Sequence, residues 1–261
     1  MKFKMFAASV ALTLGLSGVA QAAAINIAGY STVGRHVIDF EDVAGTNFPG
    51  TTYNGILSSG GATFAERFEG QTLSFVTDNV TGAPLDVLSG TPAGPLTLAP
   101  GAAGRNLAIG TDSTKNLLPC GDYTCADPNG YGEGSFAVLF SGGVSYFGMQ
   151  QLFGHDTSKL TTLDFFNSSG GLIQRVTVNV TSSFVAFSRE GGVKDIAGVS
   201  VFTRDPGGLS YDNLVYDTPA APVVTGVPEP ATWTLLIGGF GFAGTALRRR
   251  RTFVGTGPAT V

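Results

Sequence analysis

The chain has 261 residues, of which 43% are hydrophobic and 13% charged, and its formal charge is −4. Disordered chains are poor in apolar residues and rich in charge, so this composition excludes general disorder. Six of the 15 basic residues lie at positions 2, 4 and 248–251, which leaves nine against 19 acidic residues between these ends, a net charge of about −10. This acidic interior excludes nucleic acid as a partner, because phosphate binding needs a basic face.

The N-terminus has the three parts of a secretory signal peptide. Lys2 and Lys4 form a positive segment, residues 5–20 are almost wholly apolar, and Ala20 and Ala22 have the spacing of a signal peptidase site. The apolar segment is too short for a comfortable membrane span. We therefore expect residues 1–22 to be a signal peptide that is cleaved after Ala22 on export.

Short alternating runs of apolar and polar residues dominate the following chain. In the second half they cover residues 135–140, 144–149, 161–166, 172–178, 184–189, 196–202 and 209–216, with Gly-rich or Asn/Ser turns between most of them. The first half offers residues 37–40, 63–68, 73–76 and 106–109, with a long loop expected at residues 81–105. No helical period is evident. The pattern predicts an all-β fold, a single antiparallel β-sandwich of jelly-roll type over residues 23–216.

Large aromatic side chains are abundant enough to fill such a core, since the chain contains 19 Phe. The expected core residues are Phe64, Phe68, Phe136, Phe140, Phe165, Phe184 and Phe187.

The two cysteines, Cys120 and Cys125, lie close together in an exported chain, which favours a disulfide. The bridge would close the loop at residues 121–124. A metal site would need more ligands than this loop provides, and the spacing differs from the C-x-x-C of redox motifs.

Acidic residues near the first and last strands form the best candidate for an ionic site. Glu41 and Asp42 follow residues 37–40, and Asp212 lies in the last run. First and last strands are commonly neighbours in a jelly-roll. The whole loosely resembles galactose-binding-like and carbohydrate-binding sandwiches, which implies a structural Ca²⁺ bound by these oxygens. The alternative is that Asp212 and Asn213 are turn or edge residues that face water.

No catalytic motif is present: there is no H-E-x-x-H, G-x-S-x-G or P-loop. His36 and His155 have no identifiable nucleophile beside them, so we assign no catalytic residue and expect a protein that is not an enzyme. Tyr53, Tyr123 and Tyr131 lie in loop-like stretches and are candidates for glycan contacts. The alternative is that each ring packs against its own loop.

The chain changes character after Tyr216. Residues 217–226 form a Pro/Ala/Thr linker. Residues 231–247 carry no charge, have Trp233 near one end and are followed by Arg248, Arg249, Arg250 and Arg251. This pattern predicts a short transmembrane helix at 231–247, with the arginines and the tail at 252–261 in the cytoplasm.

The order Val-Pro-Glu-Pro, Ala-Thr-Trp, apolar segment and Arg run at residues 227–251 resembles the PEP-CTERM sorting signal. Pro228, Glu229 and Pro230 match its recognition motif, and Trp233 and the four arginines match the rest. The resemblance implies export by a Gram-negative bacterium, tethering at the inner membrane, and processing by an exosortase, an enzyme whose genes accompany exopolysaccharide production. We therefore expect a cell-surface or matrix protein that contacts exopolysaccharide. The alternatives are an enzyme that acts on polysaccharide and a matrix protein without a specific ligand.

Overall fold

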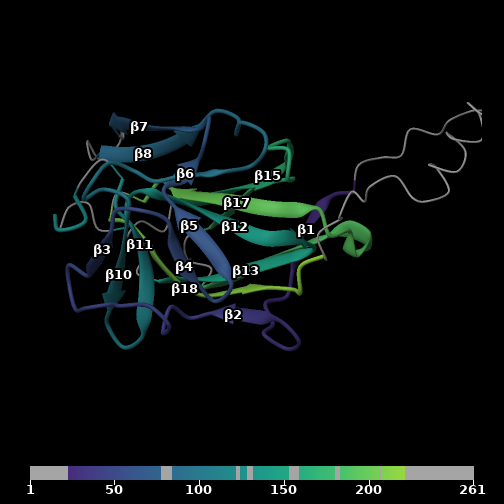
Figure 1. The fold of residues 1–261 in the computed structure, drawn as a ribbon, viewed down its shortest axis with the longest axis horizontal. Coiled ribbons are helices and arrows are strands. Elements are labelled where there is room, and N and C mark those ends of the chain that lie inside the picture. The colour runs from purple at the N-terminus through teal and green to yellow at the C-terminus, as the bar shows by residue number, and fades with distance from the viewer. Residues whose placement is uncertain are drawn as a thin grey trace, which may run out of the picture. The chain divides into compact units, whose positions relative to one another are not determined.

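The computed structural model describes residues 23–77, 84–121, 124–127, 132–152, 159–179, 183–205 and 207–220 (Figure 1). These residues form strands and turns without an α-helix, and a 3-10 turn covers Glu190–Gly192. The predicted all-β class is therefore confirmed. The predicted signal peptide, with Ala20 and Ala22, and the predicted transmembrane helix lie outside the described residues.

Two large antiparallel sheets contain most of the strands. The first has the spatial order β1 (Ile25–Ala28), β16 (Phe184–Arg189), β13 (Tyr146–Leu152), β18 (Ser210–Tyr216), β11 (Lys115–Pro119), β10 (Leu107–Thr111) and β3 (Thr51–Tyr53), and β2 (His36–Ile38) also pairs with β18. The second has the order β15 (Leu172–Asn179), β14 (Leu160–Phe166), β17 (Ile196–Thr203), β12 (Ser135–Val144), β5 (Ala62–Ala65) and β4 (Leu57–Ser59).

The last strand lies inside the first sheet and pairs with an early strand. Leu214 of β18 pairs with Ile38 of β2, and Tyr216 pairs with His36. The expected neighbourhood of the first strong run and the last run is thus confirmed. It brings the chain that follows β2 close to the middle of β18.

Aromatic side chains from both large sheets form one hydrophobic core. The ring of Phe165 on β14 lies 5.3 Å from that of Phe187 on β16, and Phe136 on β12 lies 4.8 Å from Tyr211 on β18. These strands form because one side of each can be buried in this shared core while the chain between them turns at Gly-rich segments.

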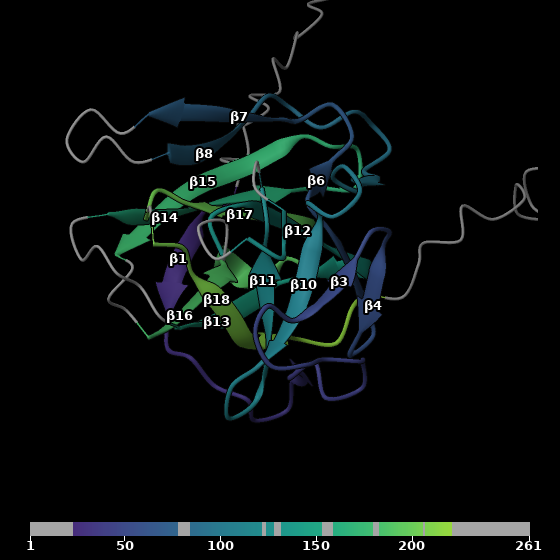
Figure 2. The same cartoon turned by 90° about the vertical axis from the view of Figure 1, so that its left-hand side faces the viewer.

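A hairpin of β7 (Thr72–Thr77) and β8 (Pro84–Ser89) lies on the outer side of the second sheet, with β8 next to β12 and β17 (Figures 1 and 2). A smaller pair, β6 (Arg67–Phe68) and β9 (Leu98–Ala99), lies nearby. Phe68 and Leu98 from this pair join Phe166 and Ala137 of the second sheet in a second hydrophobic cluster. These strands therefore cover part of the outer side of the second sheet.

Two expectations are wrong in detail. The loop expected at residues 81–105 contains β8 and β9. Phe184 is not a core residue, because its side chain is 49% exposed and its ring lies 4.7 Å from that of Tyr30. Phe184 is the first residue of β16, and the hydrophobic core does not extend to this end of the strand. The other six expected phenylalanines are buried.

Contacts with the domain continue beyond β18 as far as Ala220. The carboxylate of Asp217 accepts hydrogen bonds from the backbone N–H groups of Ser145 and Tyr146 and from the Ser145 hydroxyl, at 2.8–3.0 Å. The N–H of Ala220 donates to the carbonyl of Gly143 at 2.7 Å. The chain thus leaves the domain beside the turn between β12 and β13.

Candidate functional site

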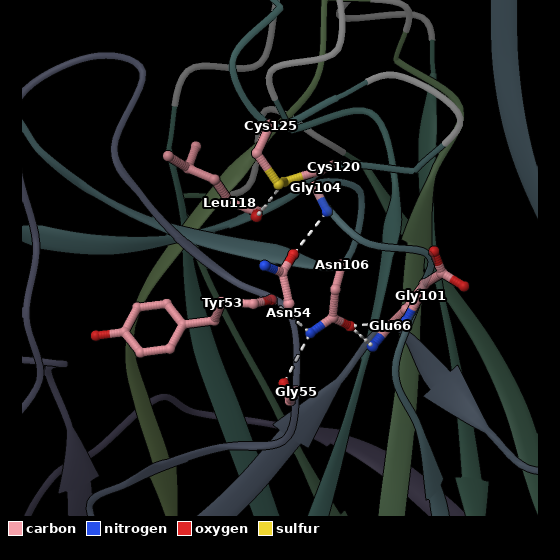
Figure 3. Close-up of a disulfide and its surroundings, with 10 residues drawn as sticks. All are labelled: Tyr53, Asn54, Gly55, Glu66, Gly101, Gly104, Asn106, Leu118, Cys120 and Cys125. Carbon is pink, nitrogen blue, oxygen red and sulfur yellow. Dashed lines mark hydrogen bonds between the residues drawn. A yellow bond between two sulfur atoms is a disulfide. The ribbon is translucent and has the colours of Figure 1, made fainter.

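A buried asparagine connects several segments of the chain near the disulfide (Figure 3). Asn106 is fully buried, and its Oδ1 accepts hydrogen bonds from the N–H groups of Glu66 at 2.9 Å and Gly101 at 3.0 Å. Its Nδ2 donates to the carbonyls of Tyr53 at 2.8 Å and Gly55 at 2.9 Å. Every polar atom of the amide therefore has partners, and three separate segments are fixed relative to one another.

Cys120 and Cys125 form a disulfide beside this asparagine, with sulfurs 2.06 Å apart (Figure 3). The N–H of Cys125 donates to the carbonyl of Gly104 at 2.7 Å, and the N–H of Gly104 donates to Oδ1 of Asn54 at 2.6 Å. The bridge and these bonds hold the end of β11 against the loop before β10.

A polar cavity of about 300 Å³ lies next to these loops, and we call it the hairpin pocket. It is lined by side chains from β6, β7 and β8 and from the loops that Asn106 connects: Glu66, Arg67, Gln71, Thr72, Leu73, Phe75, Asp86, Ala102, Arg105 and Gly121. Gln71 is buried and anchored, because its Oε1 accepts from the N–H of Phe68 at 3.0 Å and its Nε2 donates to Ser200 at 3.2 Å. The part of the pocket lining that Gln71 forms is therefore held in place.

Charged groups of both signs line this pocket. Glu66 is buried and forms an ion pair with Arg67, whose side chain is partly exposed. Burial raises the pKa of Glu66, and the neighbouring Arg67 opposes that rise. The Nε of Arg67 also donates to the carbonyl of Gln71 at 3.2 Å. The pocket thus presents a guanidinium held in place by a carboxylate and a backbone carbonyl.

Two glycines allow the backbone to approach the pocket carboxylates. A Cβ at Gly101 would lie 2.3 Å from Oε1 of Glu66, and one at Gly121 would lie 1.7 Å from Oδ2 of Asp86. Gly121 also has a φ of +61°, which side chains rarely adopt. The pocket floor therefore depends on the absence of side chains at both positions.

Each of the three predicted calcium ligands has its own hydrogen-bond partners, although Glu41 lies near enough to Asp212 to raise its pKa. Glu41 accepts from the N–H of Lys115 at 3.1 Å and lies 3.5 Å from its ammonium. Asp42 instead accepts from Ser59 and from the N–H of Gly60. Asp212 is buried on β18 and accepts from Thr114 at 3.0 Å. Within the described ranges, no three His, Cys, Asp or Glu side chains form a metal-binding group.

Tyr53 lies at the end of β3 rather than in a loop. Its ring packs against the main core, and its hydroxyl donates to the carbonyl of Ala44 at 2.8 Å. The ring of His36 stacks on that of Tyr216 at 4.9 Å. Tyr123, Tyr131 and His155 lie outside the described residues. Asn106 and Arg67 belong to no recognisable sequence motif, so neither could be predicted as a site residue.

The comparisons with known proteins concern the C-terminus. No curated protein matches the chain. A family model described as the PEP-CTERM protein-sorting motif matches residues 226–251, which include Pro228, Glu229, Pro230, Trp233 and the four arginines. In the described part of the chain, no helix is both long and apolar enough to cross a membrane. The motif implies processing by an exosortase. The chain therefore carries a PEP-CTERM protein-sorting motif at its C-terminus, and this motif implies that the protein is exported.

Proposed function

We propose that this protein is a non-enzymatic component of the cell surface or extracellular matrix that contacts exopolysaccharide through the hairpin pocket. In this proposal the described domain is a β-sandwich of jelly-roll type that presents the pocket at one end. The sorting motif supports a position outside the cytoplasm. The composition of the pocket carries the proposal of a saccharide ligand.

Saccharide recognition needs hydrogen-bonding groups beside an apolar surface. The hairpin pocket is lined by the charged side chains of Glu66 and Arg67 and by the apolar side chains of Leu73 and Phe75 on β7. Leu73 and Phe75 are two residues apart, so they lie on the same side of the strand. Phe75 is 49% exposed, which leaves its ring available to the apolar face of a sugar.

Binding of the full chain, purified in detergent, to a glycan array tests this proposal. Phe75→Ala is expected to lose most of the signal. The matched control is Val76→Ala, which removes another exposed side chain of β7 that does not line the pocket. Equal binding by the two variants, or no saccharide bound by the wild type, would show that the pocket is not a glycan site.

A polysaccharide-acting enzyme is the second candidate, and one observation favours it. Glu66 has a raised pKa and shares the pocket with the buried carboxylate of Asp86. Glycoside hydrolysis uses a pair of carboxyl groups, one as acid and one as base or nucleophile. Release of reducing sugar by the wild type and its loss in Glu66→Gln would favour the enzyme over the binding protein.

We further propose that residues 231–247 hold the unprocessed chain in the inner membrane of a Gram-negative cell, with residues 248–251 on the cytoplasmic side. The proposal rests on the uncharged stretch and the arginine run that follows it. In a strain without exosortase, the unprocessed form should accumulate in the membrane fraction at a higher mass. An unchanged mass and location in that strain would contradict the proposal.

A further inference from the structure

A β-bulge interrupts β18 where it pairs with β13. Gly148 pairs with Val215 but Gln150 pairs with Asp212, so β18 contains one residue more than its partner between these pairs. Tyr211 and Leu214 both lie in the core. Asp212 and Asn213 stand between them and line a cavity instead. Bulges commonly redirect side chains next to functional sites.

Asn213 has a left-handed backbone conformation. Its φ is +47°, in a region that few residues with a side chain other than Asn and Asp adopt. Its Nδ2 donates to Oε1 of Gln150 at 2.8 Å and to Oδ2 of Asp212 at 3.1 Å, and its carbonyl accepts from the hydroxyl of Tyr30 at 2.7 Å. The surroundings therefore fix this conformation, as is typical of residues that shape a site.

The cavity, which we call the bulge pocket, has a volume of about 220 Å³. Nearly all of its lining side chains carry oxygen: Asp112, Ser113, Thr114, Asn116, Gln150, Leu152, Asp212 and Asn213. Within the described residues, none of the basic side chains lines it. The pocket is separate from the hairpin pocket, since the two share no lining residue.

The carboxylate of Asp212 is buried here without a basic partner among the described residues. Its residue is 2% exposed, and its oxygens accept hydrogen bonds from Asn213 and Thr114. Burial raises the pKa of Asp212, those hydrogen bonds oppose the rise, and the nearby carboxylates of Asp39 and Glu41 add to it. Asp212 thus lies near other acidic side chains and, among the described residues, has hydrogen-bond donors but no ion pair.

Asn116 provides a second and independent observation. The residue is 3% exposed, and its Oδ1 is buried without a hydrogen-bond partner. Its Nδ2 donates to the carbonyl of Thr114 at 3.4 Å, which assigns the amide orientation and leaves Oδ1 as the unsatisfied atom. A buried acceptor without a partner costs about 1–3 kcal/mol, so a ligand that supplies positive charge would remove that cost.

We propose that the bulge pocket binds a divalent cation that prefers oxygen ligands, Ca²⁺, with Asp212 and Asn116 as ligands and Asp112 at the rim. A cation both satisfies Oδ1 of Asn116 and compensates the charge of Asp212, whereas a neutral sugar would leave that charge in place. Ca²⁺ combines carboxylate and amide oxygens with waters, and the cavity has room for these waters. The proposal retains Asp212 from the sequence prediction and replaces Glu41 and Asp42.

Calorimetric titration of the chelator-treated full chain with Ca²⁺ tests the site. The wild type should bind one Ca²⁺ and unfold at a higher temperature with Ca²⁺ than with chelator. Asp212→Asn retains the shape of the side chain and removes its charge, so it should bind at least about tenfold more weakly. Asn116→Leu removes the unsatisfied acceptor at similar size, so it should fold well in chelator yet gain no stability from Ca²⁺.

Asp42→Asn is the matched control, because it removes a carboxylate from the predicted set outside the bulge pocket. It should bind Ca²⁺ like the wild type. Loss of binding in Asp42→Asn but not in Asp212→Asn would overturn the proposal, as would a folded wild type that binds no Ca²⁺. Stabilisation of the wild type by a saccharide in chelator, lost in Asn116→Leu, would make the pocket a sugar site instead.

Discussion

The side-chain amide of Asn106 donates to the carbonyl of Tyr53 at 2.8 Å and thereby ties the start of β10 to the end of β3. Asn106→Ala would remove the hydrogen-bond partner of two backbone N–H groups and two backbone carbonyls. We expect the free energy of unfolding to fall by about 3 kcal/mol, measured by urea denaturation. Asn54→Ala, which removes one bond from an exposed side chain, should cost about 1 kcal/mol. Similar losses in the two variants would contradict the central role of Asn106.

The disulfide should stabilise the domain only modestly, because it closes a short loop. Its cysteines are five positions apart, and the entropy lost by the unfolded chain grows with loop length. Replacing both Cys120 and Cys125 by Ala should lower the free energy of unfolding by about 2 kcal/mol and leave the fold intact. Circular dichroism checks the fold, and urea denaturation gives the energy. A variant that does not fold would show that the bridge does more than restrict the unfolded chain.

Gly121 should tolerate a side chain far less well than Gly104, although both have positive φ. A Cβ at Gly104 meets nothing within 4 Å, so Gly104→Ala should cost about 1 kcal/mol from backbone strain alone. At Gly121 the new methyl group collides with Asp86, which should add about 1–3 kcal/mol. Thermal unfolding of both variants measures the difference. Equal unfolding temperatures for the two variants would mean that the Asp86 side chain moves away from the new methyl group at no cost.

Glu133 should make the domain less stable as the pH rises. Burial, aided by the nearby carboxylates of Asp86, Asp205 and Asp127, raises its pKa to about 8 from an ordinary value of 4.5. The unfolded chain therefore releases this proton at lower pH than the fold does, so stability is lost as pH rises from about 4.5 to 8. Glu133→Gln should remove this part of the pH dependence. Denaturation of both proteins across that range provides the measurement, and parallel curves would refute the assignment.

The second half of the fold could be predicted because its strands are long and alternate. The expected run at 184–189 is β16 to the residue, and that at 161–166 differs from β14 by one position. Strands such as Leu98–Ala99 are too short for any alternation to appear, so the first half was harder to interpret. Their positions depend on contacts with the second sheet, which a local pattern does not contain.

The sites could be predicted only in part. Asp212 was identified because β2 and β18 were expected to be neighbours, and they are. The predicted partners Glu41 and Asp42 form no metal-binding group with it among the described residues, although Glu41 lies near Asp212. Asn106 shows the wider limit: the segments that it joins, at Tyr53, Glu66 and Gly101, are distant or unremarkable in sequence. A residue that bonds to several distant segments can be recognised only from the folded structure.

The contacts of Asp217 and Ala220 determine where mechanical load enters the domain. Any tension in the chain beyond Ala220 acts first on the hydrogen bond from Ala220 to Gly143. It then acts on Asp217 and its three hydrogen bonds with Ser145 and Tyr146, and after these on β18. This strand is bonded to β13 on one side and to β11 and β2 on the other. A pull from the sorting tail must therefore strain two ladders of hydrogen bonds together, rather than peel a single strand from the edge of a sheet.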